Sequence, residues 1–396
     1  MAKKIEENFF TSNVFIFDSY SCHCELTETY SQTQQDDVPA FKIIPDSTHP
    51  IKLAFETKVG LVRLNADGTV NEENLLGKLA GIDRVDKLMS FFECNGFFWS
   101  IAPETAELIP IDDLIIIKDR LRATLELMST ITDMSRTSYE KIVRMIYYHL
   151  FMPKSAIQKT DYSSAIYHPY RSFLDTHRRE PREDRLNDTF NNEIFSFSDS
   201  IMNFSMNADL VDSILKGTPN DDRYEHWLFR DIFNTYCTPR AGKDNIMLYI
   251  NDFLFHYFYE VGIITGVDFD RTDYYRDTVN KSNFTDTMKE HATEIGKLII
   301  KEELEENLQG VHPIYNIEKL EPRWKIDSLL SALYFGLFYM RPKLEGYRRC
   351  ADPKCNQFFQ CSVTSRKKKY CSTACLNRMM IANKRARDRA KESMEE

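Results

Sequence analysis

The segment CADPKCNQFFQCSVTSRKKKYCSTAC occupies residues 350–375. It contains two closely spaced thiol pairs, Cys350 with Cys355 and Cys371 with Cys375, and fifteen residues separate the pairs. Such pairs are typical of a metal site, and four thiolates with no further donor nearby favour tetrahedral zinc. Because four protein ligands leave no open position for water, the sequence predicts one structural Zn²⁺ rather than a catalytic one.

The residues around the four cysteines predict the local fold of this module. Asp352 and Pro353 form a tight turn between the first two cysteines, which makes that segment a knuckle. Residues 358–363 have the pattern of a strand, and residues 367–370 are expected to return beside it as a hairpin. A helix then begins beside Cys375, where its N-terminal dipole helps to keep the thiolate deprotonated. Knuckle, hairpin and helix in this order predict a treble-clef-like zinc finger.

The same segment resembles the CGNR-type zinc finger. The similarity rests on four cysteines at this spacing, a Phe after the second, a basic run ending in an aromatic residue before the third, and Asn377-Arg378 after the fourth. Leu376 stands where the family name has Gly, which changes the local turn and leaves the ligands intact. The resemblance implies a bacterial transcriptional regulator that binds DNA. It also implies a helical, stress-responsive body before the finger, which residues 75–134 match in general pattern only.

Charge divides the chain into an acidic body and a basic end. The formal net charge is −9 at pH 7. Residues 341–396 carry fifteen Lys/Arg against six Asp/Glu, whereas residues 1–340 carry 36 against 54. Opposite signs in two parts of one chain indicate a basic interaction module on an acidic protein.

The basic residues surround the last two cysteines and continue along the helix that follows them. Met379, Ala382, Ala386 and Ala390 form a small apolar stripe that is expected to face the hairpin. The basic residues suit phosphate contacts, and Asn377 and the arginines also suit base edges. The alternatives are a solvated tail and docking on the protein's own acidic body. The predicted nucleic-acid contacts are Arg366, Lys367, Lys368, Lys369, Asn377, Arg378, Lys384, Arg385, Arg387 and Arg389.

The rest of the chain reads as mainly helical with a small β-rich N-terminal part. The expected divisions are 1–70 for the β-rich part, 71–340 for the helical body, and 341–396 for the finger with its basic helix. Residues 153–199 break the helical pattern and predict a long loop or a lobe boundary. The expected strands are 13–17, 41–44 and 58–64, and the expected helices are 114–131, 139–150, 224–234, 244–262, 285–306 and 324–340.

Other cysteines and histidines are interpreted as packing residues. Cys22-His23-Cys24 has no second pair nearby, and alternation in a strand places both thiols on one buried face. Cys361 has no partner at ligand spacing and is structural or free. His149 and His256 lie in apolar aromatic helices, where satisfied core histidines are the simpler interpretation.

Composition favours the cytoplasm. The start of the chain has no apolar signal-peptide core, and the longest uncharged apolar stretch, residues 329–340, is too short to span a bilayer. Nine cysteines, four of them at metal spacing, are typical of a reducing compartment. A membrane partner is therefore not expected.

These observations predict a zinc-finger protein that binds nucleic acid, with duplex DNA favoured and RNA as an alternative partner. The body then senses a signal or forms a homodimer. The alternative function is a protein-interaction or scaffold module in stress or phage response, whose basic helix binds an acidic protein surface. An enzyme is less favoured, because no catalytic set is separable from the sixty acidic residues.

Overall fold

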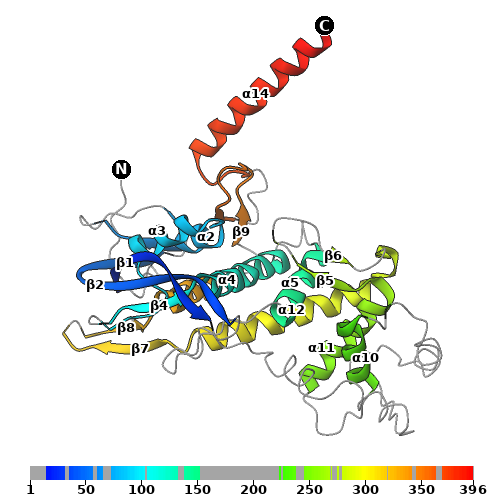
Figure 1. Cartoon of the computed structure of the whole chain (residues 1–396), viewed down its shortest axis with the longest axis horizontal. Coiled ribbons are helices and arrows are strands. Elements are labelled where there is room, and N and C mark those ends of the chain that lie inside the picture. The colour runs from blue at the N-terminus through cyan, green and yellow to red at the C-terminus, as the bar shows by residue number, and fades with distance from the viewer. Residues whose placement is uncertain are drawn as a thin grey trace. The chain divides into compact units, whose positions relative to one another are not determined.

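The computed structural model shows a mainly helical protein with small antiparallel sheets (Figure 1). The predicted loop or lobe boundary at 153–199 lies outside the residues that the structure describes. Among the described residues no helix has both the length and the apolar character needed to cross a bilayer. The structure describes residues 15–31, 35–56, 60–65, 73–102, 105–132, 138–151, 223, 226–237, 245–267, 269, 274–275, 279–318, 320–340, 345–362 and 368–395.

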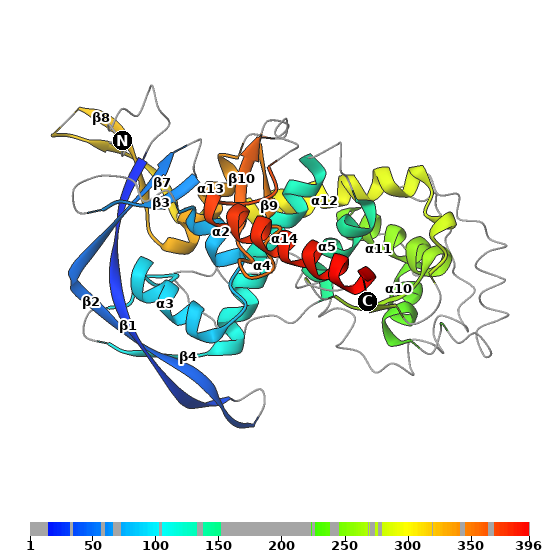
Figure 2. The ribbon, with the colours of Figure 1, turned by 90° about the horizontal axis from the view of Figure 1, so that it is seen from above.

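The N-terminal sheet confirms the predicted β-rich part, and its first two strands are longer than the strands expected there. A long antiparallel ribbon is formed by β1 (Phe15–Ser31) and β2 (Asp36–Glu56). Strand β2 also pairs with β3 (Gly60–Arg63) and β4 (Glu107–Pro110). Figure 2 shows helix α3 (Val85–Asn95) lying along this ribbon.

The Cys22-His23-Cys24 motif lies on β1 and packs as predicted. Both thiols are buried, and their sulfur atoms lie 3.9 Å apart. Alternation along the strand turns His23 outward, where it contacts Glu25 and Glu93.

The chain separates into two compact units. Unit 1 contains the described parts of Met1–Thr137 and Lys301–Glu396, and unit 2 contains those of Ser138–Met152 and His168–Ile300. The chain therefore returns to unit 1 before it reaches the four-cysteine segment.

Three of the helices in unit 1 pack against the N-terminal sheet. Helix α2 (Leu75–Ala80) is capped by Asn74, whose Oδ1 accepts a hydrogen bond from Gly77 N at 2.7 Å. Helix α4 (Ile111–Thr132) confirms the predicted amphipathic helix and begins with two aspartates that suit its N-terminal dipole. Helix α13 (Leu329–Phe338) is apolar and almost entirely buried.

Unit 2 contains an aromatic core. Four helical elements form it: α5 (Tyr139–Phe151), α10 (Trp227–Cys237), α11 (Asn245–His256) and a π-helix (Tyr257–Val261). The rings of Phe253, Phe255, Tyr257 and Phe258 are buried in this core. The remaining elements are β5 (Ile264–Gly266), β6 (Tyr274–Tyr275), a 3₁₀ helix (Lys281–Asn283) and α12 (Asp286–Asn307), which continues into unit 1.

The prediction of one helix over residues 324–340 was wrong at its start. Strands β7 (Val311–Asn316) and β8 (Glu321–Ile326) form an antiparallel hairpin there. Helix α13 begins only after Ser328, whose side chain caps it by accepting from Ser331 N.

The C-terminal module contains two short strands and a long helix. Strand β9 (Glu345–Arg349) pairs antiparallel with β10 (Phe358–Ser362), so the first two cysteines lie in the turn between them. The predicted pairing of β10 with residues 367–370 was wrong, because the described part of that segment forms no strand. Helix α14 (Thr373–Glu395) follows and carries the last cysteine in its first turn.

Candidate metal centre

The four cysteines converge on one point. Their sulfur atoms all lie within 4.8 Å of one another. The distances from Cys371 Sγ are 3.5 Å to Cys355 Sγ and 3.6 Å to Cys375 Sγ. A tetrahedral zinc ion with Zn–S bonds of about 2.3 Å needs sulfurs about 3.8 Å apart. Cys350, Cys355, Cys371 and Cys375 are therefore close enough to hold one metal ion, and the donor set is compatible with zinc.

The backbone positions the first pair. Cys350 N donates to Gln357 O at 2.8 Å, and Cys355 N donates to Asp352 O at 2.9 Å. These bonds close the knuckle that the Asp-Pro turn predicts. Ala351 N donates to Lys369 O at 2.9 Å, which attaches the segment before the second pair to the knuckle.

Helix α14 positions the second pair. Ser372 Oγ accepts a hydrogen bond from Cys375 N at 3.3 Å, so the Ser372 side chain caps the helix. Burial raises the pKa of Cys355 to about 11, and burial also raises the pKa of Cys371. Burial opposes ionisation of Cys375 as well, but hydrogen bonds from Ser372 and the neighbouring thiols outweigh it and lower the pKa of Cys375. Metal binding must therefore displace protons from Cys355 and Cys371.

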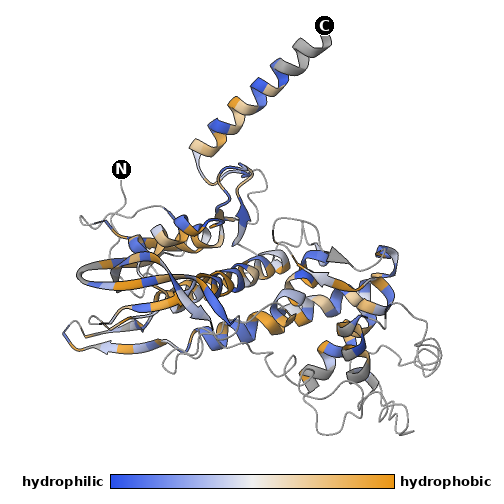
Figure 3. Ribbon diagram, viewed as in Figure 1, coloured by the Kyte–Doolittle hydropathy of each residue, from blue (hydrophilic) through white to orange (hydrophobic). Residues whose placement is uncertain are grey.

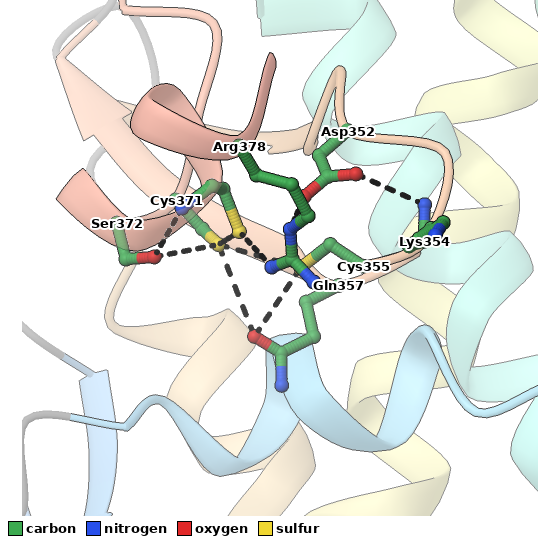
Figure 4. A network of polar contacts seen from close by, with 8 residues as sticks. Asp352, Lys354, Cys355, Gln357, Cys371, Ser372 and Arg378 are labelled. Carbon is green, nitrogen blue, oxygen red and sulfur yellow. Dashed lines mark hydrogen bonds and ion pairs between the residues drawn. The ribbon is translucent and has the colours of Figure 1, made fainter. Parts of the chain in front are cut away.

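Arg378 connects the two halves of the site (Figure 4). Its Nε lies 2.8 Å from Oδ2 of Asp352, whose side chain is only 1% exposed. Its Nη2 donates a hydrogen bond to Cys375 Sγ at 3.5 Å. The hydrogen bond to Cys375 and the charge of Asp352 raise the pKa of Arg378. The guanidinium thus places a positive charge beside a sulfur ligand and joins α14 to the knuckle.

The sequence did not predict the contacts that Asp352 and Gln357 make near the four sulfurs. Asp352 was predicted as a turn former, but its buried carboxylate also anchors Arg378. Gln357 has its Oε1 3.8 Å from Cys355 Sγ and 4.0 Å from Cys371 Sγ, while its Nε2 donates to Glu73 at 3.2 Å. No local pattern marks a glutamine as a link between a metal site and a distant helix.

The interior of the module explains Cys361. It is buried with Phe359 beside two of the ligands, and its thiol donates to Gly346 O at 3.5 Å. It stands outside the four-sulfur group, which confirms its interpretation as a structural cysteine.

The module is docked on α2 by close backbone contact. A Cβ atom at Gly77 would lie 2.0 Å from Phe358 O, and one at Gly81 would lie 2.4 Å from Asn356 O. Asn356 Nδ2 also donates to Asp83 at 2.8 Å, and Asn74 Nδ2 donates to the buried Tyr347 hydroxyl at 2.9 Å. The two glycines allow an approach that no other residue type permits.

Helix α4 completes the docking surface. Ser129 Oγ accepts from Tyr347 N at 3.1 Å, and the Arg122 guanidinium lies 5.5 Å from the centre of the Phe358 ring. Arg122 is itself buried and paired with Glu126. Helix α2 contacts β10 of the module, and helix α4 contacts β9.

The described side chains of helix α14 beyond Cys375, residues 376–388, are exposed except for the half-buried Met379. The predicted apolar stripe does not cover the strands, because Ala382 and Ala386 are exposed. Charged and apolar residues instead alternate along the helix (Figure 3). Of the predicted nucleic-acid contacts, Arg366, Lys367 and the Arg389 side chain lie outside the described residues, Arg378 lies at the metal centre, and Lys368, Lys369, Asn377, Lys384, Arg385 and Arg387 are exposed.

Among the described residues, neither His149 nor His256 belongs to a group of potential metal ligands. His149 is fully buried in α5. His256 contacts the Tyr236 hydroxyl at 3.3 Å and Glu260 at 3.2 Å, which confirms a satisfied core histidine.

The chain matches no family model, no curated protein and no solved structure.

Proposed function

We propose that this protein is a zinc-dependent DNA-binding regulator, in which a treble-clef finger presents α14 to a duplex. One observation carries the proposal: a four-thiol cluster sits at the base of a long helix that is exposed and basic. Structural zinc in small modules stabilises a fold that does not form without it. Here the metal orders the base of α14, and Lys384, Arg385 and Arg387 supply phosphate contacts.

The length of α14 suits a duplex. Its 23 residues extend about 34 Å at 1.5 Å per residue. This length matches roughly one turn of B-DNA, and a single α-helix fits the major groove. Asn377 lies at the exposed base of the helix, where its amide suits an adenine edge. The body is then the part that senses a signal or dimerises in a bacterial cytoplasm.

A direct test measures binding of the zinc-loaded protein to mixed-sequence duplex DNA and RNA across a range of salt concentrations. Wild-type affinity is expected to fall steeply with salt, and K384Q/R385Q/R387Q is expected to lower the slope by about 2.7, at 0.9 for each lost phosphate contact. The control K297Q/K301Q/K325Q removes the same charge from exposed lysines elsewhere and should leave the slope unchanged. Absence of duplex binding at low salt, with one zinc per chain, would refute the proposal.

A second candidate function has a specific observation in its favour. Leu376, Met380 and Ile381 expose 40%, 62% and 55% of their surfaces near the base of α14. Neighbouring exposed apolar side chains are more typical of a protein interface than of a DNA contact. A scaffold function predicts that Met380→Ser abolishes a protein complex and leaves duplex affinity unchanged. If K384Q/R385Q/R387Q loses duplex affinity and keeps its protein partners, the scaffold function is contradicted.

A further inference from the structure

A groove lies between the docked finger and helices α2 and α3. Its volume is about 1480 Å³, which exceeds the roughly 300–1,000 Å³ of ordinary small-molecule pockets. One wall comes from α2 and α3, and the other comes from the segment around Lys354 and from residues 368–373. The first turns of α14 also line it, through Thr373, Leu376 and Arg378. The groove is therefore continuous with the surface proposed to contact DNA.

The charged side chains that line this groove are mostly cationic. Five lysines and one arginine line it against two acids, and both acids form ion pairs with neighbouring cations. Glu73 pairs with Lys78 at 2.8 Å, and Asp86 pairs with Arg84 at 2.9 Å. The cations that line the groove are Lys78, Lys87, Lys354, Lys368, Lys369 and Arg378, and the acids are Glu73 and Asp86.

Three of these cations are available to a ligand. Lys78, Lys87 and Arg378 pair with carboxylates of the chain, whereas Lys354, Lys368 and Lys369 form no ion pair with any described residue. All three are exposed, and the Lys368 ammonium lies over the Phe359 ring at 5.2 Å. A zinc ion with four thiolates carries a formal charge of −2, which Arg378 at the sulfur partly offsets. The three lysines thus leave the groove with an excess of positive charge.

We propose that this groove receives one sugar–phosphate strand of the duplex that α14 contacts. The inference rests on the proposed function and extends it, because it adds a second contact on the body side of the finger. Three lysines and the Thr373 hydroxyl are the donors that phosphate oxygens usually meet in DNA complexes. A groove too large for a small ligand and continuous with a basic helix fits an extended anionic chain. Binding in it fixes the direction in which α14 enters the duplex.

Lysine acetylation tests the proposal without changing the sequence. The zinc-loaded chain is treated with an acetylating reagent, alone and with saturating mixed-sequence duplex, and each lysine is quantified by mass spectrometry. Lys354, Lys368 and Lys369 are expected to be protected several-fold by the duplex, as Lys384 on α14 is. Lys301, which is 58% exposed and lies on α12, serves as the unprotected control.

A charge-removal variant provides the second measurement. K354Q/K368Q/K369Q should lower the salt slope of duplex binding by about 2.7, as expected for three lost phosphate contacts. Retention of one zinc per chain shows that the finger is intact. Protection of Lys384 without protection of the three groove lysines, together with an unchanged slope, overturns the groove and leaves the proposed function standing. If polyglutamate binds in the groove and no duplex binds, both the groove proposal and the proposed function are wrong.

Discussion

Substitution of Gly77 by alanine isolates the docking of the finger on the body. The new Cβ would lie 2.0 Å from Phe358 O and 2.8 Å from Phe358 C, whereas ordinary contact begins at 3.4 Å. The finger backbone must therefore move by about 1.4 Å, and it cannot evade the contact by rotating a side chain. Strain of this kind costs about 1–3 kcal/mol. Alanine in a helix recovers up to about 1 kcal/mol relative to glycine, so the net effect is destabilising.

Gly336→Ala is the matched control. Gly336 also lies in a helix, but the nearest atom to its Cβ is Phe55 Cε2 at 3.9 Å, which is an ordinary contact. This variant is expected to be neutral or up to about 1 kcal/mol more stable than wild type. Urea unfolding compares the three proteins, and hydrogen exchange of residues 345–362 reports on docking. If Gly77→Ala unfolds at the same urea concentration as Gly336→Ala, with unchanged exchange, the close-contact argument is wrong.

Two further perturbations address the metal and the core. Cys371→Ser should abolish stoichiometric metal binding, whereas Cys361→Ser should retain one metal per chain, as measured by atomic emission on the purified proteins. Arg120→Ala leaves the fully buried Glu303 without its ion pair and should cost about 3–5 kcal/mol at neutral pH in urea unfolding. Burial raises the pKa of Glu303, so its contribution is complete below the ordinary carboxylate pKa and is lost as pH rises through the raised value. The deficit of Arg120→Ala should therefore shrink on acidification, and a deficit that grows towards acidic pH would contradict this assignment.

The cysteine spacing predicted that the four thiols converge, because the information is local. A knuckle, a cap and a ligand in the first helical turn each depend on a few adjacent residues, so Cys350 to Cys375 can be interpreted without the body. The long helices were predictable for a similar reason. Leu114, Ile117 and Leu121 recur at helical spacing on α4, and all three are buried.

The errors arose where two patterns or two distant segments compete. In β8 the apolar Pro322, Trp324 and Ile326 alternate with Arg323 and Lys325, a period of two that the apolar run of the next helix concealed. The partner of β10 was misassigned because β9 precedes the knuckle and has no strong strand pattern. The docking on α2 was not predictable, since a glycine in a helix does not reveal which backbone lies against it.

Docking and metal binding share one segment of chain. Asn356, Gln357 and Phe358 contact the body, and they follow directly after the ligand Cys355. If metal binding favours the docked geometry, docking must favour metal binding by the same factor, because coupling between two equilibria is reciprocal. Gly77→Ala should therefore weaken zinc affinity in a chelator competition, although Gly77 is not a ligand, while Gly336→Ala should not. Equal zinc affinity in a variant whose residues 345–362 exchange faster would show that the finger folds around its metal independently of the body.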